Sequence, residues 1–303
     1  VTSIAAMKIV VSGASGLIGK PLVADLRNSG HEVTQLVRRP PGNGEKQWNP
    51  GTGQLDVAAI DGVDAVIHLS GAGIGDRRWT GKYKEELLQS RTKSTALLAT
   101  TISKCAKKPG VFLSGSAIGI YGPRGDEELT EQSAAGSSFL AEICRQWEAA
   151  ARPAADAGVR TVFLRTGIVL TPSGGALKKQ LPLFKLGLGG KFGNGKQWQS
   201  WISLDDEISA IKHLLSANVS GAVNLTAPNP VTNAEFTRTL ARTLRRPAIL
   251  PIPKFGPKLL LGGELAEALL FTGQRVMPAA LQRSGFAFQH ATLDVALRAL
   301  LNK

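Results

Sequence analysis

The sequence contains little cysteine and little acid, and it has no long apolar run. Only Cys105 and Cys144 occur among 303 residues, both in segments with helical spacing. Two thiols make a poor disulfide framework and lack zinc-site spacing, so we expect a protein of the reducing cytoplasm without a metal site. No apolar run approaches the roughly 20 residues that span a bilayer, and we expect no membrane partner. Residues 1–6 lack the features of a signal peptide, and we interpret them as a tail or linker before Met7.

The shortage of acidic residues gives the chain a formal net charge of +13. Lysine and arginine are spread along the sequence and are not concentrated on one element or interleaved with aromatic residues, which disfavours a nucleic-acid partner. The charge is compatible with an anionic small-molecule substrate. The apolar fraction of 43% is ordinary for a globular protein, and 303 residues suffice for one large α/β domain or for a core domain with a smaller cap.

Three glycines follow directly on the first apolar run, in the segment KIVVSGASGLIG at residues 8–19. The β-branched run 9–11 predicts a buried parallel strand, and the glycines predict a tight turn into a helix. Such a turn lets a phosphate approach the backbone, and the helix N-terminus adds free N–H groups. The spacing is G-x-x-G-x-x-G and not the commonest dinucleotide fingerprint. With a turn that binds nothing as the alternative, we expect a dinucleotide site at Gly13, Ser15, Gly16, Leu17, Ile18 and Gly19.

The second predicted strand, at residues 31–37, is followed by Arg38 and Arg39. In a dinucleotide fold the end of this strand faces the adenosine ribose, where an acidic side chain accepts from the 2′-hydroxyl and arginine matches a 2′-phosphate. No acidic residue follows before Glu45. The sequence therefore predicts NADP(H) as the cofactor; two solvated loop arginines are the alternative.

Further predicted strands at residues 64–71, 111–114 and 159–170 end at the sheet edge where ligands bind. A long helix that ends at about residue 106 would run past the cofactor. His68 lies inside a predicted strand, and we interpret it as a core histidine. The additional cofactor-binding residues that we expect are Leu69, Ser70, Gly71, Glu86, Arg91, Ser114 and Val169.

The alternation of strands and helices over residues 7–170 predicts an α/β fold, a Rossmann-type doubly wound parallel sheet. From residue 171 the regular alternation of strands and helices is replaced by a stretch rich in glycine and aromatic residues. Residues 171–303 therefore predict a smaller C-terminal α+β cap, from which some segments return to the sheet. The expected cap elements are helices at about 205–217, 232–244, 258–271 and 293–301, and short strands near Val223 and Ile249. Two stretches predict substrate contacts: a basic loop, and a later segment rich in glycine and tryptophan. A structural crossover is the alternative for the later segment. The predicted residues are Arg77, Arg78, Trp79, Lys196, Trp198 and Trp201.

Several motifs carry a family resemblance that covers nearly the whole chain from Met7. SGASGLIG, SGSAIGIYG and WISLDD resemble the extended short-chain dehydrogenase/reductases, in the NAD(P)-dependent epimerase branch. The runs RTGIVL, PSGGALKKQLPLFKLGLGGKFGNGKQWQSWI, APNPVTNAEF and GQRVMPAALQRSGFAF resemble atypical epimerase-family proteins with a C-terminal domain of uncharacterised function. The resemblance implies a Rossmann domain, NADP(H) binding and a sugar-nucleotide-epimerase activity that has been assigned mostly by homology. Some relatives are called cell-division inhibitors.

The chemistry of this superfamily uses a serine, a tyrosine that exchanges the proton, and a lysine four residues later that lowers the tyrosine pKa. Ser116 matches the serine of the motif. Phe139 stands at the tyrosine position and Ile143 at the lysine position, and neither side chain can transfer a proton. The chain therefore resembles the family without its usual proton-transfer pair.

Other side chains are candidates to replace this pair. Tyr121, next to the serine segment, and Glu142, in the altered helix, are the first candidates, and Ser116 and Tyr121 form our predicted catalytic set. Asp205 and Lys196 are weaker candidates. Each has a structural alternative: a tyrosine at the edge of the core, a solvated helix face for Glu142, and an N-cap for Asp205.

Two functions remain open at this point. The first is an NADP-dependent epimerase or reductase, an oxidoreductase-type enzyme that acts on a small, anionic substrate such as a nucleotide sugar. The second is a non-catalytic NADP(H)-binding regulatory or scaffold protein, motivated by the missing pair. Extended family members are often homodimers through two long helices, here about residues 82–106 and 138–157, and a monomer is the alternative.

Overall fold

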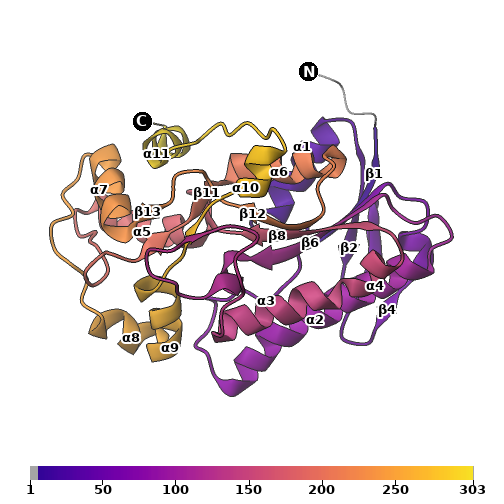
Figure 1. Ribbon diagram of the computed structural model, residues 1–303, viewed down its shortest axis with the longest axis horizontal. Helices are drawn as coiled ribbons and strands as arrows, with labels where there is room; N and C mark the ends of the chain where they lie inside the picture. Colours follow the sequence, from indigo (N-terminus) through magenta and orange to yellow (C-terminus); the bar gives the residue numbers. More distant parts are fainter. Residues whose placement is uncertain (1–5, 303) are drawn as a thin grey trace.

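The computed structural model describes residues 6–302, so the expected tail lies outside the described residues except for Ala6. An eight-stranded sheet forms the centre of the protein (Figure 1). Its neighbouring strands are parallel except for the last pair. The chain starts in the middle of the sheet and adds strands on both sides, as the sequence predicts. The order is β12 (Gly221–Leu225), β8 (Arg160–Thr166), β6 (Val111–Ala117), β5 (Ala65–His68), β1 (Lys8–Ser12), β2 (Glu32–Val37), β3 (Glu45–Asn49) and β4 (Gln54–Leu55).

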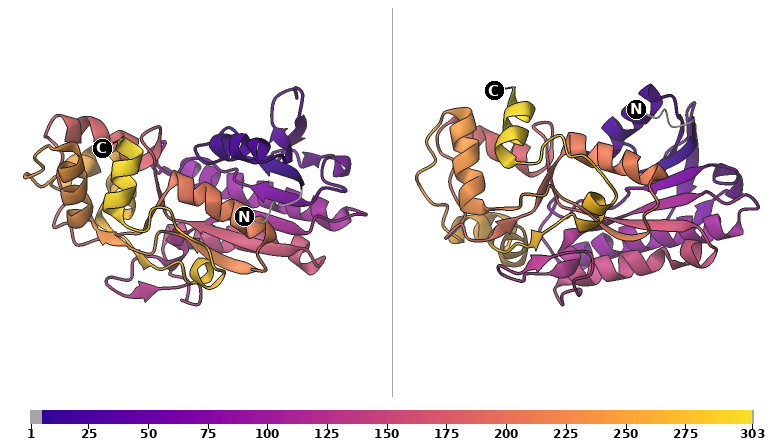
Figure 2. Two further views of the ribbon diagram at one scale, coloured as in Figure 1. Left: turned by 90° about the horizontal axis from the view of Figure 1, so that it is seen from above. Right: turned by 45° about the horizontal axis from the view of Figure 1, so that its top comes forward.

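Helices cover both faces of this sheet (Figures 1 and 2). Along β1 the side chains alternate, so that Ile9 and Val11 join one buried cluster and Val10 joins the other. On the first face lie α1 (Gly19–Asn28), α6 (Leu204–Ser216) and α10 (Ala279–Arg283). On the second face lie α2 (Gly81–Lys104), α3 (Phe139–Ala150) and α4 (Arg152–Asp156). The short turns η1 (Val57–Ala59) and η2 (Ile118–Tyr121) complete this part.

The cap is built around a third buried cluster with Trp201 at its centre. Its helices are α5 (Gly175–Lys185), α7 (Asn233–Leu244) and α11 (Leu293–Leu301). Small sheets connect it to the rest of the chain: β9 (Ile168–Leu170) with β11 (Trp201–Ser203), β10 (Trp198–Gln199) with β13 (Val231–Thr232), and β7 (Glu128–Leu129) with β14 (Arg275–Val276). Among residues 6–302, no helix is long and apolar enough to cross a membrane.

Three expectations for the cap need correction. The strand near Val223 is β12, which pairs with β8 at the edge of the main sheet, and α6 also packs against that sheet. No strand forms at Ile249; the nearest pairing is an isolated bridge between Ile252 and Phe192. The helix expected at 258–271 is divided into α8 (Phe255–Leu261), α9 (Gly263–Ala266) and η3 (Glu267–Phe271), because Gly262 has a φ of 91° that ends α8.

Candidate functional site

The glycine turn joins β1 to α1 at the carboxyl edge of the sheet. Gly13 has a φ of 74°, and a Cβ added there would lie 2.6 Å from the carbonyl carbon of Leu69. A Cβ on Gly19 would lie 2.1 Å from the oxygen of Gly13. These two glycines are therefore required by the close packing of the turn. Gly16 differs, because a Cβ there would meet one atom only, the Gly13 oxygen at 3.2 Å, and otherwise open space.

The N-terminus of α1 has the properties of an anion site. Its N-cap residue is Ile18, which provides no side-chain hydrogen bond, and no acidic residue lies in the first turn. The N–H groups of that turn and the positive end of the helix dipole therefore have no capping partner from the described side chains. Together with the open space above Gly16, this arrangement fits the pyrophosphate of a dinucleotide.

Neighbouring strand ends surround the glycine turn. Gly13 packs on Leu69 and Ser70, which follow β5, and Leu17 lies against Gly174 and Gly175, near the carbonyl of Val169. The structure therefore brings together the turn and three residues from two strand ends that the sequence analysis selected, Leu69 and Ser70 after β5 and Val169 after β8. Ser114 lies in the middle of β6, beside His68 of β5, and is buried, and its hydroxyl has no hydrogen-bond partner among the described residues. The strand continues to Ala117, three residues beyond the end that the sequence predicts at Ser114.

Buried polar groups fix the edge next to this turn. His68 contacts Ser12 Oγ at 2.6 Å and Ser94 Oγ at 3.2 Å, and burial with the nearby Arg91 charge lowers its pKa to about 3. The interpretation of His68 as a neutral core histidine is confirmed. Arg91 is buried over the Trp147 ring and donates to the carbonyls of Leu87 and Ala72, both at 2.9 Å.

The two arginines after β2 have different surroundings. Arg39 forms a bidentate pair with Glu45, with nitrogen–oxygen distances of 2.7 and 2.6 Å. Arg38 is exposed and has no hydrogen bond or ion pair with the described residues. Glu86, another expected cofactor residue, is exposed and contacts Arg77, which is also exposed, at 3.5 Å. Of these side chains, Arg38 is the one whose charge is available to a phosphate.

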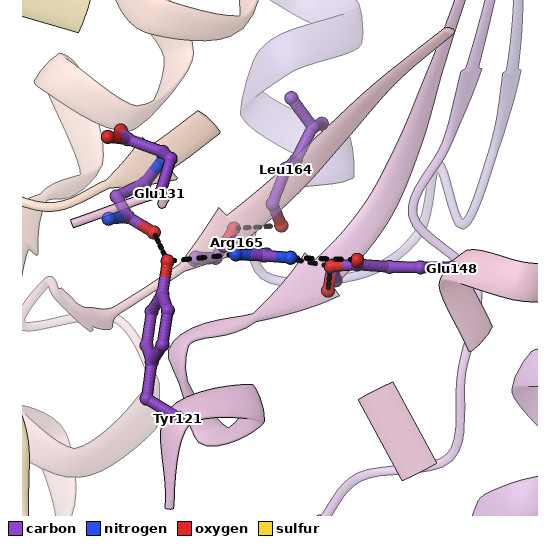
Figure 3. A network of polar contacts seen from close by, with 8 residues as sticks. Tyr121, Glu131, Glu148, Leu164 and Arg165 are labelled. Carbon is purple, nitrogen blue, oxygen red and sulfur yellow. Dashed lines mark hydrogen bonds and ion pairs between the residues drawn. The ribbon is translucent and has the colours of Figure 1, made fainter. Parts of the chain in front are cut away.

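The two predicted catalytic hydroxyls belong to a buried network (Figure 3). Ser116 donates to Glu148 Oε1 at 2.7 Å, and Arg165 pairs with both oxygens of Glu148 at 2.8 and 2.9 Å. Arg165 also donates to the Tyr121 hydroxyl at 3.0 Å, which in turn donates to Asn224 at 2.6 Å. Burial raises the pKa of Tyr121. Tyr121 is thus a structural tyrosine, and its hydroxyl does not face the cavity described below.

In α3 the positions of the superfamily's tyrosine and lysine are both occupied by apolar residues. The Phe139 ring packs edge-on against Trp79, with centroids 5.1 Å apart, and Ile143 is buried. The side chain of Glu142 is half-exposed, and hydrogen bonds from Gln146 and Arg145 lower its pKa, so it is a solvated carboxylate.

Asp205, a weaker candidate, is an exposed residue in the first turn of α6. Ser203 is the N-cap of that helix, where its hydroxyl accepts from the Asp206 N–H. The interpretation of Asp205 as the N-cap is therefore wrong, because the N-cap lies two residues earlier, at Ser203.

A cavity of about 220 Å³ lies between the carboxyl edge of the sheet and the cap. Its wall is mainly apolar, with polar contributions from Arg91, Thr166 and three glutamines. The wall comes from the loop before α2, the end of β6, α3, the β8–β9 junction, the β10 region and η3, and includes Ile74, Ala117, Ile118, Ile143, Cys144, Trp147, Ile168, Gln197, Trp198, Gln199, Leu269, Leu270 and Gln274. Its mainly apolar wall with a few polar groups has the chemistry of a small-molecule site.

The predicted substrate residues are not all at this cavity. Trp198 lines it and donates its Nε1–H to Asp126 at 2.7 Å. Trp201 is fully buried in the cap core, where it donates to the carbonyl of Asn229, so its assignment as a substrate contact is wrong. Trp79 donates to the Ile74 carbonyl at 2.9 Å.

The basic residues of the predicted substrate set lie outside the cavity wall. Arg78 donates to the carbonyls of Leu259 and Leu260 and thereby attaches the α2 side to the cap. Arg77 and Lys196 are exposed and do not line the cavity. The anionic character of a substrate is therefore not explained by these three side chains.

Glu207 is a residue that sequence reasoning missed. It is fully buried at the start of α6, and Thr166 Oγ1 donates to its Oε1 at 2.9 Å. Its Oε2 has no hydrogen-bond partner among the described residues, and burial raises its pKa to about 8. Thr166 lines the cavity, so the carboxyl lies directly behind the cavity wall. The neighbouring Asp206 is also buried but accepts hydrogen bonds from two backbone N–H groups.

Comparisons with known proteins cover almost the entire chain. Residues 9–226 match the model of the NAD dependent epimerase/dehydratase family, and residues 252–300 match a domain of unknown function. The epimerase family protein MT2273 of Mycobacterium tuberculosis is 44% identical over 291 residues, which cover 95% of this chain and 96% of that protein. The human epimerase family protein SDR39U1 is 36% identical over 299 residues, which cover 97% of this chain and all (100%) of that protein.

Solved structures show the same relationship. The crystal structure of human epimerase family protein SDR39U1 (isoform 2) with NADPH has a TM-score of 0.90 and 34% identity, and the match covers 98% of this chain and 100% of that chain. The crystal structure of the nucleoside-diphosphate sugar epimerase from Corynebacterium glutamicum has a TM-score of 0.80 and 37% identity. That match covers 98% of this chain and 58% of that chain.

Proposed function

The chain belongs to the NAD-dependent epimerase/dehydratase family, and we propose that it is an NADP(H)-dependent epimerase or reductase of a small, anionic substrate. The observation that carries this proposal is the combination of an uncapped α1 N-terminus with a 220 Å³ cavity at the same edge of the sheet. A dinucleotide at the α1 N-terminus and a small molecule in the cavity would meet at that edge of the sheet.

The preference for the phosphorylated cofactor rests on the residues after β2. Glu45 forms a bidentate ion pair with Arg39, so Arg38 is the arginine available to a 2′-phosphate. The Gly16 position leaves room for the pyrophosphate. The NADPH present in the structure of the human relative supports the same assignment. When bound, NADP(H) supplies or accepts a hydride; the remaining chemistry belongs to the side chains of this chain.

The proton that accompanies hydride transfer requires a donor, and Ser116 and Tyr121 are both occupied by structural partners. We assign this task to Thr166 and Glu207. For this transfer the Thr166 hydroxyl would turn from Glu207 Oε1 toward a substrate oxygen at the cavity wall, give its proton to that oxygen and take one from the protonated Glu207 carboxyl behind it. A pKa of about 8 keeps that carboxyl protonated at neutral pH, which suits a general acid.

A nucleotide sugar is the substrate class that we infer, because the relative from Corynebacterium glutamicum is a nucleoside-diphosphate sugar epimerase. The Trp198 ring and the buried Arg91 are the aromatic and cationic groups that the cavity offers to it. We propose a cytoplasmic protein, either a monomer or a homodimer through α2 and α3.

A second candidate function is a non-catalytic NADP(H)-binding regulator or scaffold, for example in cell division. The apolar Phe139 and Ile143 and the bound hydroxyls of Ser116 and Tyr121 favour it.

The experiment that separates the two candidates incubates the protein with NADPH or NADP⁺ and a panel of nucleotide sugars. Reduced nicotinamide is followed by absorbance, and epimer formation by proton NMR. The enzyme hypothesis predicts turnover that Thr166→Val and Glu207→Gln reduce by about 10²-fold or more. Tight NADPH binding without turnover on the whole panel would favour the regulator.

A further inference from the structure

The exposed apolar side chains of this protein gather in one part of the cap. Eleven large apolar residues are exposed in the described chain, and nine of them lie between residues 183 and 269. Single exposed leucines are ordinary on protein surfaces, but a contiguous group marks a contact site. All but Leu269, which lies in η3, come from the end of α5 and the residues after it, the loop before α8 and the α8 helix, at the end of the molecule opposite β4 (Figure 1).

Hydrogen bonds join the two segments into one surface. The Ile252 N–H donates to the Lys191 carbonyl at 2.8 Å, and the Gly193 N–H donates to the Ile252 carbonyl at 3.0 Å. The helix α8 has no buried side chain, and Phe255 and Leu259 lie one turn apart on it. We call the following residues, each 64–83% exposed, the apolar patch: Leu186, Leu188, Ile249, Leu250, Phe255 and Leu259.

The charged residues within the two segments that form the apolar patch all have one sign. The segments 183–191 and 245–260 contain six basic residues and no acidic residue. Two of the six, Lys254 and Lys258, pair with Glu267. The other four have no ion pair with the described residues, and these are Lys185, Lys191, Arg245 and Arg246.

We propose that the apolar patch rests on an anionic lipid surface. The apolar side chains would enter the boundary between headgroups and acyl chains while the four unpaired cations contact lipid phosphates. A second copy of this chain would place like charges against each other, which disfavours self-association through the patch. The patch residues do not line the 220 Å³ cavity, so this surface is separate from the substrate site.

This inference changes one expectation from the sequence. The absence of a membrane partner was inferred from the lack of an apolar run of spanning length, which does not bear on contact with a lipid surface. The patch is assembled from segments about 60 residues apart, so no single run of the sequence reveals it. It also does not depend on the proposed enzyme activity.

The test measures co-sedimentation of the full-length protein with vesicles of phosphatidylcholine alone and of phosphatidylcholine mixed with phosphatidylglycerol. We expect binding to the mixed vesicles and at least about tenfold weaker binding to phosphatidylcholine. The double variant Ile249→Asp/Leu250→Asp should lose about tenfold or more in affinity, and Lys185→Gln/Arg246→Gln a comparable amount. Matched controls outside the patch, Val295→Asp and Lys107→Gln/Lys108→Gln, should bind like the wild type.

Several results would overturn the inference. These are no binding to either vesicle, equal binding to both, or equal losses in the patch variants and their controls. Light scattering after size exclusion adds another test: a dimer that Ile249→Asp/Leu250→Asp converts to monomer would assign the patch to a second copy. Circular dichroism verifies that each variant is folded. Neither cofactor nor turnover enters the measurement, so the inference and the proposed function fail separately.

Discussion

Ser116 donates its hydroxyl proton to Glu148 Oε1 at 2.7 Å, and thereby connects the end of β6 to α3. The motif serine is therefore part of the packing between sheet and helix in this structure. Glu148 is held by Arg165 as well, and both side chains of that ion pair are close to nine-tenths buried. In the short-chain dehydrogenase/reductases that this chain resembles, the motif serine orients the substrate. In this protein Ser116 instead binds Glu148.

Removal of the Glu148 carboxylate should destabilise the fold strongly. In Glu148→Ala the guanidinium of Arg165 stays buried without its partner, and the expected loss is about 3–5 kcal/mol in the free energy of unfolding. Ser116→Ala removes one neutral donor to that carboxylate and should lose about 1 kcal/mol. Urea unfolding at neutral pH measures both. Equal stability of Glu148→Ala and the wild type would contradict the described network.

Gly16 and Gly19 should respond differently to alanine. A Cβ on Gly16 meets one atom at 3.2 Å, so Gly16→Ala should fold and lose about 1 kcal/mol or less in the free energy of unfolding. Its methyl group would occupy space needed by the pyrophosphate, so its affinity for NADPH should fall at least about tenfold. Gly19→Ala places a methyl 2.1 Å from the Gly13 oxygen and should lose roughly 2–4 kcal/mol of stability.

The matched control for these variants is Gly81→Ala, because a Cβ on Gly81 at the start of α2 meets nothing within 4 Å. Thermal unfolding and calorimetry with NADPH measure the two effects separately. A folded Gly16→Ala with unchanged NADPH affinity would place the cofactor elsewhere.

Glu207 should make the stability depend on pH in a defined direction. Burial raises its folded-state pKa from 4.5 to about 8, so its contribution is complete below pH 4.5 and is lost as the pH rises through 8. The glutamine of Glu207→Gln cannot ionise, so the free energy of unfolding of this variant should match that of the wild type at pH 4 and exceed it by roughly 2–4 kcal/mol at pH 9. Urea unfolding at both pH values measures this difference.

The control is Glu85→Gln, which changes an exposed carboxylate and should leave the pH profile of the wild type unchanged. Parallel profiles for wild type and Glu207→Gln would show that the carboxyl is not held neutral in the fold.

Local sequence patterns were sufficient for the glycine turn and the elements on either side of it, whereas β3 and β4 were not predicted. The run Ile9–Val11 and the glycines after it predict β1, the turn and α1, because each depends on neighbouring residues alone. The core position of His68 was also predicted, since a polar residue within an apolar strand is usually buried with hydrogen-bond partners.

Long-range pairing limited the remaining predictions. The strand at Val223 carries no local sign of its partner, and its pairing with β8, more than 50 residues earlier, places it in the main sheet. Trp198 and Trp201 are three residues apart, yet they belong to β10 and β11, and only Trp198 faces the cavity. The burial of Glu207 depends on how α6 packs on the sheet, so a charged residue at a helix start gave no signal.

The central claim is that NADP(H) lies at the α1 N-terminus, with its 2′-phosphate at Arg38. Titration calorimetry of NADPH and NADH against the wild type and Arg38→Ala tests it most directly. The account predicts NADPH binding at least about tenfold tighter than NADH, and a loss of most of that difference in Arg38→Ala with NADH affinity unchanged. Equal affinities of the wild type for both cofactors, or no binding of either, would contradict it.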